Sequence, residues 1–153
     1  YFNLEYLGPL PIIVQGCVGI QTDNKNFKNF VLIKFWRDPE VPESSQGELT
    51  LESGHQLLET IIRCWSPHLA TWTTTAWLRA VPKREAYTPS LGWKTYFSEP
   101  AVCELISDLG KPLHQGILLE TATDIHDVTP EKIAALAQEL ADRGVEDTLY
   151  RGA

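Results

Sequence analysis

Four residues near the end of the chain carry side chains that could bind a metal ion, namely Glu120, Asp124, His126 and Asp127. Carboxylate oxygens and imidazole nitrogens are common ligands of divalent cations. A simpler interpretation exists, because aspartates that precede a helix form Asx-turns and favour the positive end of the helix dipole. We favour the turn interpretation, and we therefore expect no metal ion and no cofactor.

Cysteine chemistry is the second candidate. Cys17 lies between Gly16 and Gly19 in an apolar stretch. To act as a nucleophile it would need a pKa lowered by a helix N-terminus or a neighbouring histidine. The other cysteines are Cys64 and Cys103, and no Cys-x-x-Cys spacing occurs. Free buried thiols in a reducing compartment are the favoured interpretation, with one disulfide and one free thiol as the alternative.

Other catalytic signatures are missing from the sequence. It contains no glycine-rich phosphate loop, no Gly-x-Ser-x-Gly elbow and no His-Glu-x-x-His motif. The sequence therefore predicts a protein that is not an enzyme and has no catalytic residues. A small metal-dependent or cysteine-dependent hydrolase stays the alternative, using Glu120, His126 and Asp127, or Cys17.

Length and composition indicate one globular domain over residues 1–153. With 153 residues and 43% hydrophobic side chains, the chain can bury a single core. No apolar run is long enough to span a bilayer. The chain begins at Tyr1 and contains no Met. We therefore expect the native start to lie upstream, so a periplasmic location stays open beside the favoured cytoplasmic one.

Charge is the strongest bulk signal. The net charge is −7. Residues 38–62 contain six acids and no Lys or Arg, and residues 95–153 contain eleven acids and four bases. Such a chain is a poor nucleic-acid binder, because neutralising phosphates supplies most of that affinity. It could suit a basic protein partner, since complementary fields speed encounter. The alternative is that the acidic charge serves solubility alone, and charge by itself favours this alternative.

The elements expected in the first half are a β-hairpin and a helix. Leu10–Ile20 and Phe30–Trp36 are apolar and β-branched, which predicts a hairpin over residues 10–37. A Pro, Ser and acid-rich loop follows. Residues 50–65 then predict a helix with one apolar stripe, capped by Thr50 or by Ser53, and Pro67 ends it.

The second half predicts strands and two helices. Strands are expected at Thr71–Val81, Gly92–Phe97 and Ile117–Thr121, and a short helix at Pro100–Leu109. In a strand over 71–81, Trp72 and Trp77 would point to opposite faces, so one of them is a candidate contact residue.

The closing helix, about residues 130–143, has the clearest signals. Thr129 is the expected N-cap, Pro130 the first helical residue and Gly144 the residue after the end. Strands and helices do not alternate strictly. We therefore expect an α+β single-domain sandwich with a mainly antiparallel sheet packed against two main helices and one short helix.

Residues 48–143 resemble the immunity protein 52 family of bacterial polymorphic toxin and type VI secretion systems. The resemblance rests on the helix Leu51 to Trp65, the turn Pro67 to Trp72, the run Gly92-Trp-Lys-Thr-Tyr-Phe-Ser98, the run Gly116-Ile-Leu-Leu-Glu-Thr-Ala122, and the closing helix after Thr129-Pro-Glu-Lys132. The Gly-Trp-x-Thr-Tyr-x-Ser pattern is the most specific part. The N-terminal hairpin lies outside the resemblance.

The resemblance implies a small cytoplasmic, non-catalytic protein that binds a cognate toxin, often a nuclease with a restriction-endonuclease fold, and blocks it stoichiometrically. An acidic inhibitor can cover the basic groove of a nuclease. The candidate toxin-binding residues are Asp38, Glu40, Glu43, Glu48, Asp124, Asp127 and Trp77. An adaptor or secretion chaperone that binds an effector without inhibiting it is a further alternative. An exposed Trp or an edge strand could also support a homodimer.

Overall fold

The computed structural model describes residues 2–6, 12–17, 30–35, 51–74, 77, 79 and 90–150. The chain forms two compact units, Tyr1–Thr50 and Leu51–Ala153. The prediction of one domain over residues 1–153 stays a prediction. In the described part, no helix is both long and apolar enough to cross a membrane.

The first unit contains an antiparallel sheet of strands β1 (Phe2–Tyr6), β2 (Ile12–Cys17) and β3 (Phe30–Phe35), in the order β1-β2-β3. Ile12 lies opposite Phe35 and Cys17 opposite Phe30. The hairpin predicted over residues 10–37 is therefore confirmed. Strand β1 was not expected from the sequence.

The second unit is a four-stranded sheet with helices. Its elements are α1 (Leu51–Trp65), β4 (Leu69–Trp72), β5 (Lys94–Phe97), α3 (Pro100–Ile106), β6 (Lys111–Leu113), β7 (Gly116–Glu120), the 3₁₀ helix η2 (Ile125–Asp127), α4 (Pro130–Asp142) and α5 (Val145–Tyr150). The strand order is β4-β5-β7-β6, and each neighbouring pair is antiparallel. The predicted α+β class with an antiparallel sheet is confirmed.

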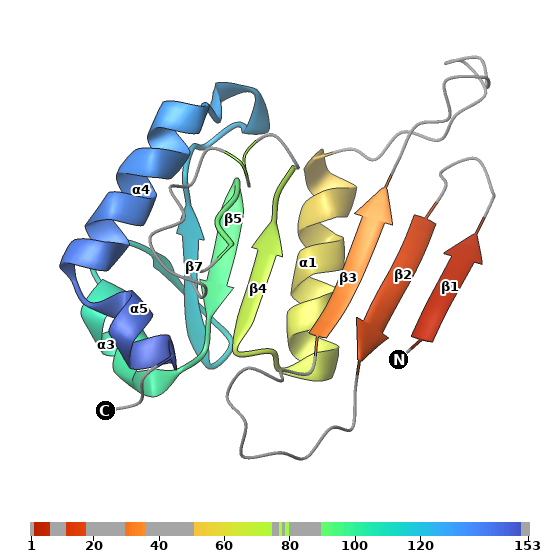
Figure 1. Ribbon diagram of the computed structural model, residues 1–153, viewed down its shortest axis with the longest axis horizontal. Coiled ribbons are helices and arrows are strands. Elements are labelled where there is room, and N and C mark those ends of the chain that lie inside the picture. The colour runs from red at the N-terminus through yellow and green to blue at the C-terminus, as the bar shows by residue number, and fades with distance from the viewer. Residues whose placement is uncertain are drawn as a thin grey trace. The chain divides into compact units, whose positions relative to one another are not determined.

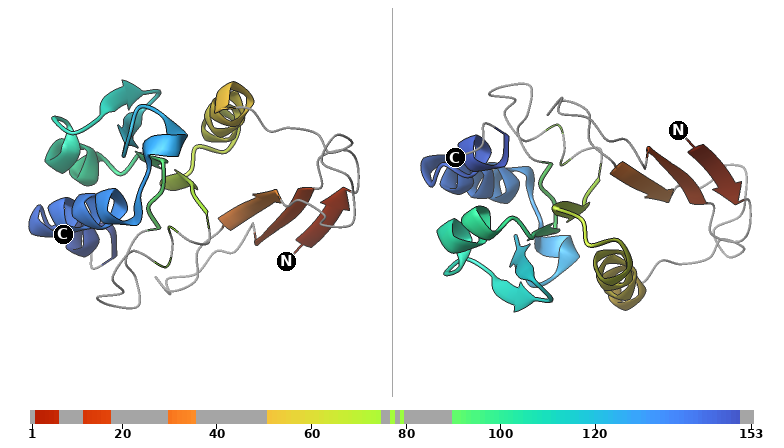
Figure 2. Two further views of the ribbon diagram at one scale, coloured as in Figure 1. Left: turned by 90° about the horizontal axis from the view of Figure 1, so that it is seen from above. Right: turned by 90° about the horizontal axis from the view of Figure 1, so that it is seen from below.

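Helices cover both faces of this sheet. Successive side chains along β5 and β7 point to opposite faces, so each strand contributes to a core on either side. Tyr96 and Leu118 point to one face and pack with Leu58 and Ile62 of α1. The next residues along the two strands, such as Phe97 and Ile117, point to the other face. The core on that face consists of Leu91, Trp93, Phe97, Val102, Ile106, Ile117, Leu119, Val128, Ile133, Leu140 and Val145. Figure 1 and Figure 2 show α1 on one side of the sheet and α3, α4 and α5 on the other.

The two main helices match their predicted bounds. Helix α1 ends at Trp65, where Ser66 takes a positive φ of 44° and Pro67 follows. Helix α4 begins after Thr129, whose side chain accepts a hydrogen bond from the Lys132 amide at 3.4 Å. Gly144 follows α4 with φ of 76°, a conformation that glycine adopts without strain.

Two predicted elements differ from the structure, and two observed elements of this unit were not predicted. The strand predicted over 71–81 is wrong at the described residues after Trp72, because Thr73 and Thr74 lie outside β4 and Trp77 and Arg79 have helical backbone. The Thr74 hydroxyl accepts a hydrogen bond from the Trp77 amide at 3.3 Å, as a helix cap does, and this turns the chain out of the strand. Helix α3 ends at Ile106 instead of Leu109. Strand β6 and helix α5 were not expected.

Candidate functional site

The run Gly92 to Ser98 forms the centre of the four-stranded sheet. Gly92 is packed against β4 so closely that a Cβ atom there would lie 2.0 Å from the Trp72 carbonyl oxygen. The indole of Trp93, only 4% exposed, donates a hydrogen bond to the Ala122 carbonyl at 2.9 Å. Ser98 donates to the Pro67 carbonyl at 2.9 Å. The most specific pattern of the sequence is therefore occupied by internal contacts.

Threonine hydroxyls fasten the segment that leads into β5. Thr71 donates to the Ser90 carbonyl at 2.7 Å, Thr73 to the Leu91 carbonyl at 2.9 Å, and Thr121 to the Gly92 carbonyl at 2.6 Å. These bonds give the carbonyls of residues 90–92 hydrogen-bond partners. Threonines at β4 and after β7 thus hold the segment that leads into β5.

Tyr96 is fully buried beneath α1. Its hydroxyl has no hydrogen-bond partner within the described ranges. Burial raises the pKa of Tyr96, which keeps the phenol neutral. A neutral, enclosed phenol fits a packing role and not that of a catalytic base.

The densest group of titratable side chains lies between α1 and the sheet. The Lys94 ammonium, with a side chain 8% exposed, lies 2.9 Å from Glu120 Oε1. It also lies 3.2 Å from His55 Nδ1 and 4.6 Å from the centre of the Trp93 ring. Lys111 contacts the other Glu120 oxygen at 2.9 Å. Hydrogen bonds from Lys111 and then Lys94 lower the pKa of Glu120, which is therefore ionised.

The predicted metal ligands are not brought together. Glu120 is held by two lysines, and no group of three or more His, Cys, Asp or Glu side chains in the described ranges could hold a metal ion. Asp124 instead accepts a hydrogen bond from the His126 amide at 2.8 Å. This contact is the Asx-turn that the sequence favoured.

The cysteines meet part of the expectation. Cys103 is half-buried and donates to the Phe97 carbonyl at 3.4 Å, and burial raises the pKa of its thiol. Cys64 is free but exposed, so the prediction of a buried thiol is wrong there. Its position on α1 lies away from the face formed by Leu58 and Ile62. The Cys17 side chain lies outside the described part.

The candidate toxin-binding residues divide into three groups. Asp38, Glu40, Glu43 and Glu48 lie outside the described residues. Asp124 and Asp127 are exposed and flank η2. Trp77 is partly buried and packs against the core on the α4 face.

Trp65 is an exposed aromatic residue that the sequence did not single out. At 52%, it is the exposed large hydrophobic residue of the described ranges. The helical periodicity of residues 50–65 predicts Trp65 on the apolar stripe of α1. Trp65 is the last residue of α1, and a side chain at a helix end can extend beyond the core, which is the sequence feature that indicates its exposure.

Each lysine and arginine of residues 90–150 has a hydrogen-bond partner within the described residues, although Lys111 and Lys132 are exposed. There are four, namely Lys94, Lys111, Lys132 and Arg143. The first two contact Glu120, and Lys132 donates to the Asp127 carbonyl at 2.8 Å. Many carboxylates of the same residues stay exposed: Glu104, Asp108, Asp124, Asp127, Glu131, Glu139, Asp142 and Asp147. The exposed charge of this part is therefore mainly negative.

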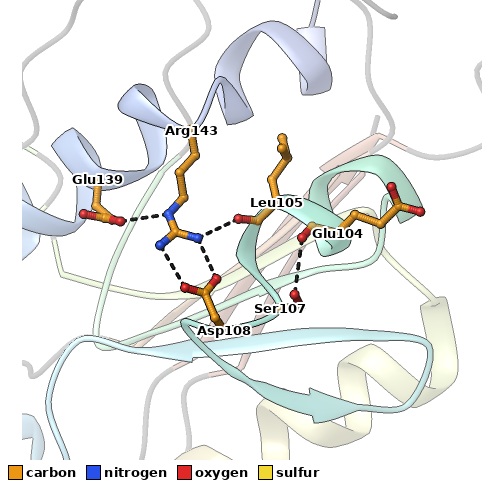
Figure 3. Close-up of polar contacts among 6 residues, drawn as sticks. All are labelled: Glu104, Leu105, Ser107, Asp108, Glu139 and Arg143. Atoms are coloured by element: carbon orange, nitrogen blue, oxygen red, sulfur yellow. Dashed lines mark hydrogen bonds and ion pairs between the residues drawn. The ribbon is translucent and has the colours of Figure 1, made fainter.

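Arg143 connects α4 to the end of α3, as Figure 3 shows. Its guanidinium contacts both Asp108 oxygens at 2.6 and 3.0 Å and Glu139 at 2.8 Å. It also donates to the Leu105 carbonyl at 2.8 Å, which caps the last turn of α3. Two-point contact with a carboxylate requires the planar guanidinium, so lysine cannot replace it.

The Arg143 contact makes stability depend on pH. Its hydrogen bond holds the pKa of Asp108 below the ordinary value. Such a carboxylate stabilises the fold above the pKa of the unfolded chain, about 4, and loses this contribution as pH falls through the folded value. We expect urea midpoints measured from pH 6 down to about pH 3 to fall less steeply in Arg143→Met than in the wild type. Parallel curves for the two proteins would contradict this.

Comparison of the chain with protein-family models, curated proteins and solved structures gave no match.

Proposed function

We propose that this chain is a non-catalytic immunity protein that binds a bacterial toxin and blocks it by stoichiometric occlusion. The observation that carries the proposal is the charge of residues 90–150, where eight carboxylates are exposed against four lysines and arginines, and where Arg143 pairs with only two of the eight, Asp108 and Glu139. Such a surface is complementary to a basic protein.

The distribution of the motif residues supports a binding role over catalysis. Residues of the Gly92–Ser98 run pack, cap or pair within the fold. Glu120, the central acid of the hydrolase alternative, is ionised and forms ion pairs with two lysines. The resemblance to the immunity protein 52 family adds a partner class, a nuclease whose basic groove binds phosphates. The cytoplasm, where such a toxin would meet DNA, is the proposed compartment.

A co-purification tests the proposal. The untagged chain is expressed with its tagged genomic neighbour, and the recovered complex is assayed for DNA degradation. A one-to-one complex without nuclease activity is the expected result. A complex that still degrades DNA would replace inhibition with an adaptor function. Absence of any complex would overturn the proposal.

Charge removal near η2 tests the role of the acidic surface. In the variant Asp124→Asn/Asp127→Asn, asparagine keeps the capping acceptor at position 124 while two charges are lost. We expect association with the toxin at low salt to slow about tenfold, because charge complementarity acts mainly on the association rate. Stopped-flow or surface-binding kinetics would measure the rate.

The matched control is Glu104→Gln/Asp142→Asn, which removes the same charge from exposed positions on α3 and α4. We expect its association rate to change less than that of the Asp124/Asp127 variant. Equal slowing by the two variants would mean that net charge, and not the surface around η2, governs encounter.

A further inference from the structure

His55 of α1 and Lys94 of β5 form a polar contact between the helix and the sheet. Lys94 Nζ lies 3.2 Å from His55 Nδ1. The other ring nitrogen, Nε2, lies 3.4 Å from Glu59 Oε1, one turn further along α1. The imidazole therefore lies between a buried cation on the sheet and an anion on its own helix.

The chemistry of lysine determines the state of the ring. A lysine ammonium has three donors and no acceptor, so His55 Nδ1 must accept the hydrogen bond. The ring is then neutral and carries its proton on Nε2, directed towards Glu59. The Glu120 carboxylate lies 2.9 Å from the Lys94 ammonium and balances its charge.

Protonation would place an N–H group on Nδ1, facing the ammonium. Two donors cannot share this hydrogen bond, and two cations at this distance repel each other. Within the described residues, the charged groups that face His55 are Glu59 from α1 itself, Lys94 from β5 and, beyond Lys94, Glu120 from β7 and Lys111 from β6. The Trp72 ring of β4 lies against Gly54 and adds no charge.

We propose that His55 is a pH-operated contact between α1 and the sheet. The neutral ring accepts from Lys94, and the protonated ring gives up Lys94 and pairs with Glu59. Since Glu59 belongs to α1, acidification turns a contact between helix and sheet into one within the helix. The apolar contacts of Leu58 and Ile62 with Tyr96 and Leu118 then hold α1 in place.

NMR of the full-length chain between about pH 5 and 8 tests the proposal, because histidine changes charge in this range. At the upper end we expect the Nε2–H form of the His55 ring and a nuclear Overhauser effect between the ring and the Lys94 side chain. At the lower end we expect that effect to be lost while the helix signals of α1 persist. Exposed His126, in the same spectra, is the internal control.

The variant Glu59→Gln separates the two partners. Position 59 is half-exposed, so the substitution leaves the core intact. Loss of the anion should weaken the low-pH pairing of the ring with position 59, seen as a weaker nuclear Overhauser effect between the two side chains than in the wild type. A ring that keeps its Lys94 contact at low pH, or that carries its proton on Nδ1 at high pH, would overturn the proposal. So would an equally strong effect between the ring and position 59 in the wild type and in Glu59→Gln.

Discussion

Gly92→Ala is expected to destabilise the second unit by more than about 3 kcal/mol, at the upper end of overpacking effects. The added Cβ would lie 2.0 Å from the Trp72 carbonyl oxygen and 2.7 Å from Thr73 Cβ. A backbone oxygen cannot swing aside as a side chain does, so β4 and β5 would have to separate. Urea unfolding followed by circular dichroism would measure the loss.

Gly144→Ala is the matched control, because it changes backbone strain without changing space. A Cβ at Gly144 would meet no atom within 4 Å, but the residue has φ of 76°. Alanine in that conformation costs about 1 kcal/mol. If Gly92→Ala were no more costly than Gly144→Ala, the close approach of Gly92 to β4 would be wrong.

Glu120→Gln is expected to cost about 3 kcal/mol, because it leaves the buried Lys94 ammonium without a carboxylate. The reverse change, Lys94→Met, leaves Glu120 with Lys111 and with a side chain 25% exposed. Its expected cost is smaller, about 1–2 kcal/mol. The two substitutions on one ion pair therefore differ in effect, and denaturant unfolding at neutral pH measures both.

The double variant Lys94→Met/Glu120→Gln completes the cycle. In the absence of Lys94, the loss of Glu120 leaves no buried cation without a partner. The double variant should therefore lower the free energy of unfolding by less than the sum of the two single variants. Additive costs would show that Lys94 and Glu120 do not interact energetically. A larger cost for Lys94→Met than for Glu120→Gln would contradict the role given to Lys111.

Local signals in the sequence were sufficient where they agreed with each other. Thr129, Pro130 and Gly144 defined both ends of α4, and all three occupy the expected positions. The apolar stripe likewise predicted α1 and its buried face. The aspartate turn at Asp124 followed from residue chemistry alone.

The errors arise where one local interaction overrides a pattern. The alternation of residues 71–81 predicts a strand, but the Thr74 hydroxyl takes the Trp77 amide and the strand ends at Trp72. A continuous strand is therefore not the reason for the placement of these two residues, although the Trp72 ring lies against Gly54 of α1 and Trp77 packs against the core on the α4 face. The ion pair of Lys94 with Glu120 could not be foreseen, because it depends on the pairing of strands 26 residues apart (94 to 120).

The acidic loop with Asp38, Glu40, Glu43 and Glu48 lies outside the described residues, so its role stays a prediction. Asp124 and Asp127 are exposed as a binding role requires, although exposure alone does not select them among the other surface acids. The exposure of Trp65 could not be predicted from periodicity, because periodicity gives the direction in which a side chain points and not how far along the helix the sheet continues to cover it.

The strand order β4-β5-β7-β6 also determines when the second unit can fold during translation. Strand β4 pairs with β5, and α1 rests on Tyr96 and Leu118, so both depend on residues made after them. Translation delivers β5, α3, β6 and β7 as one continuous stretch, and short sequence separations favour rapid pairing within it. The apolar face of α1 stays without its sheet until that stretch leaves the exit tunnel, so the second unit cannot complete its fold before β7 has emerged.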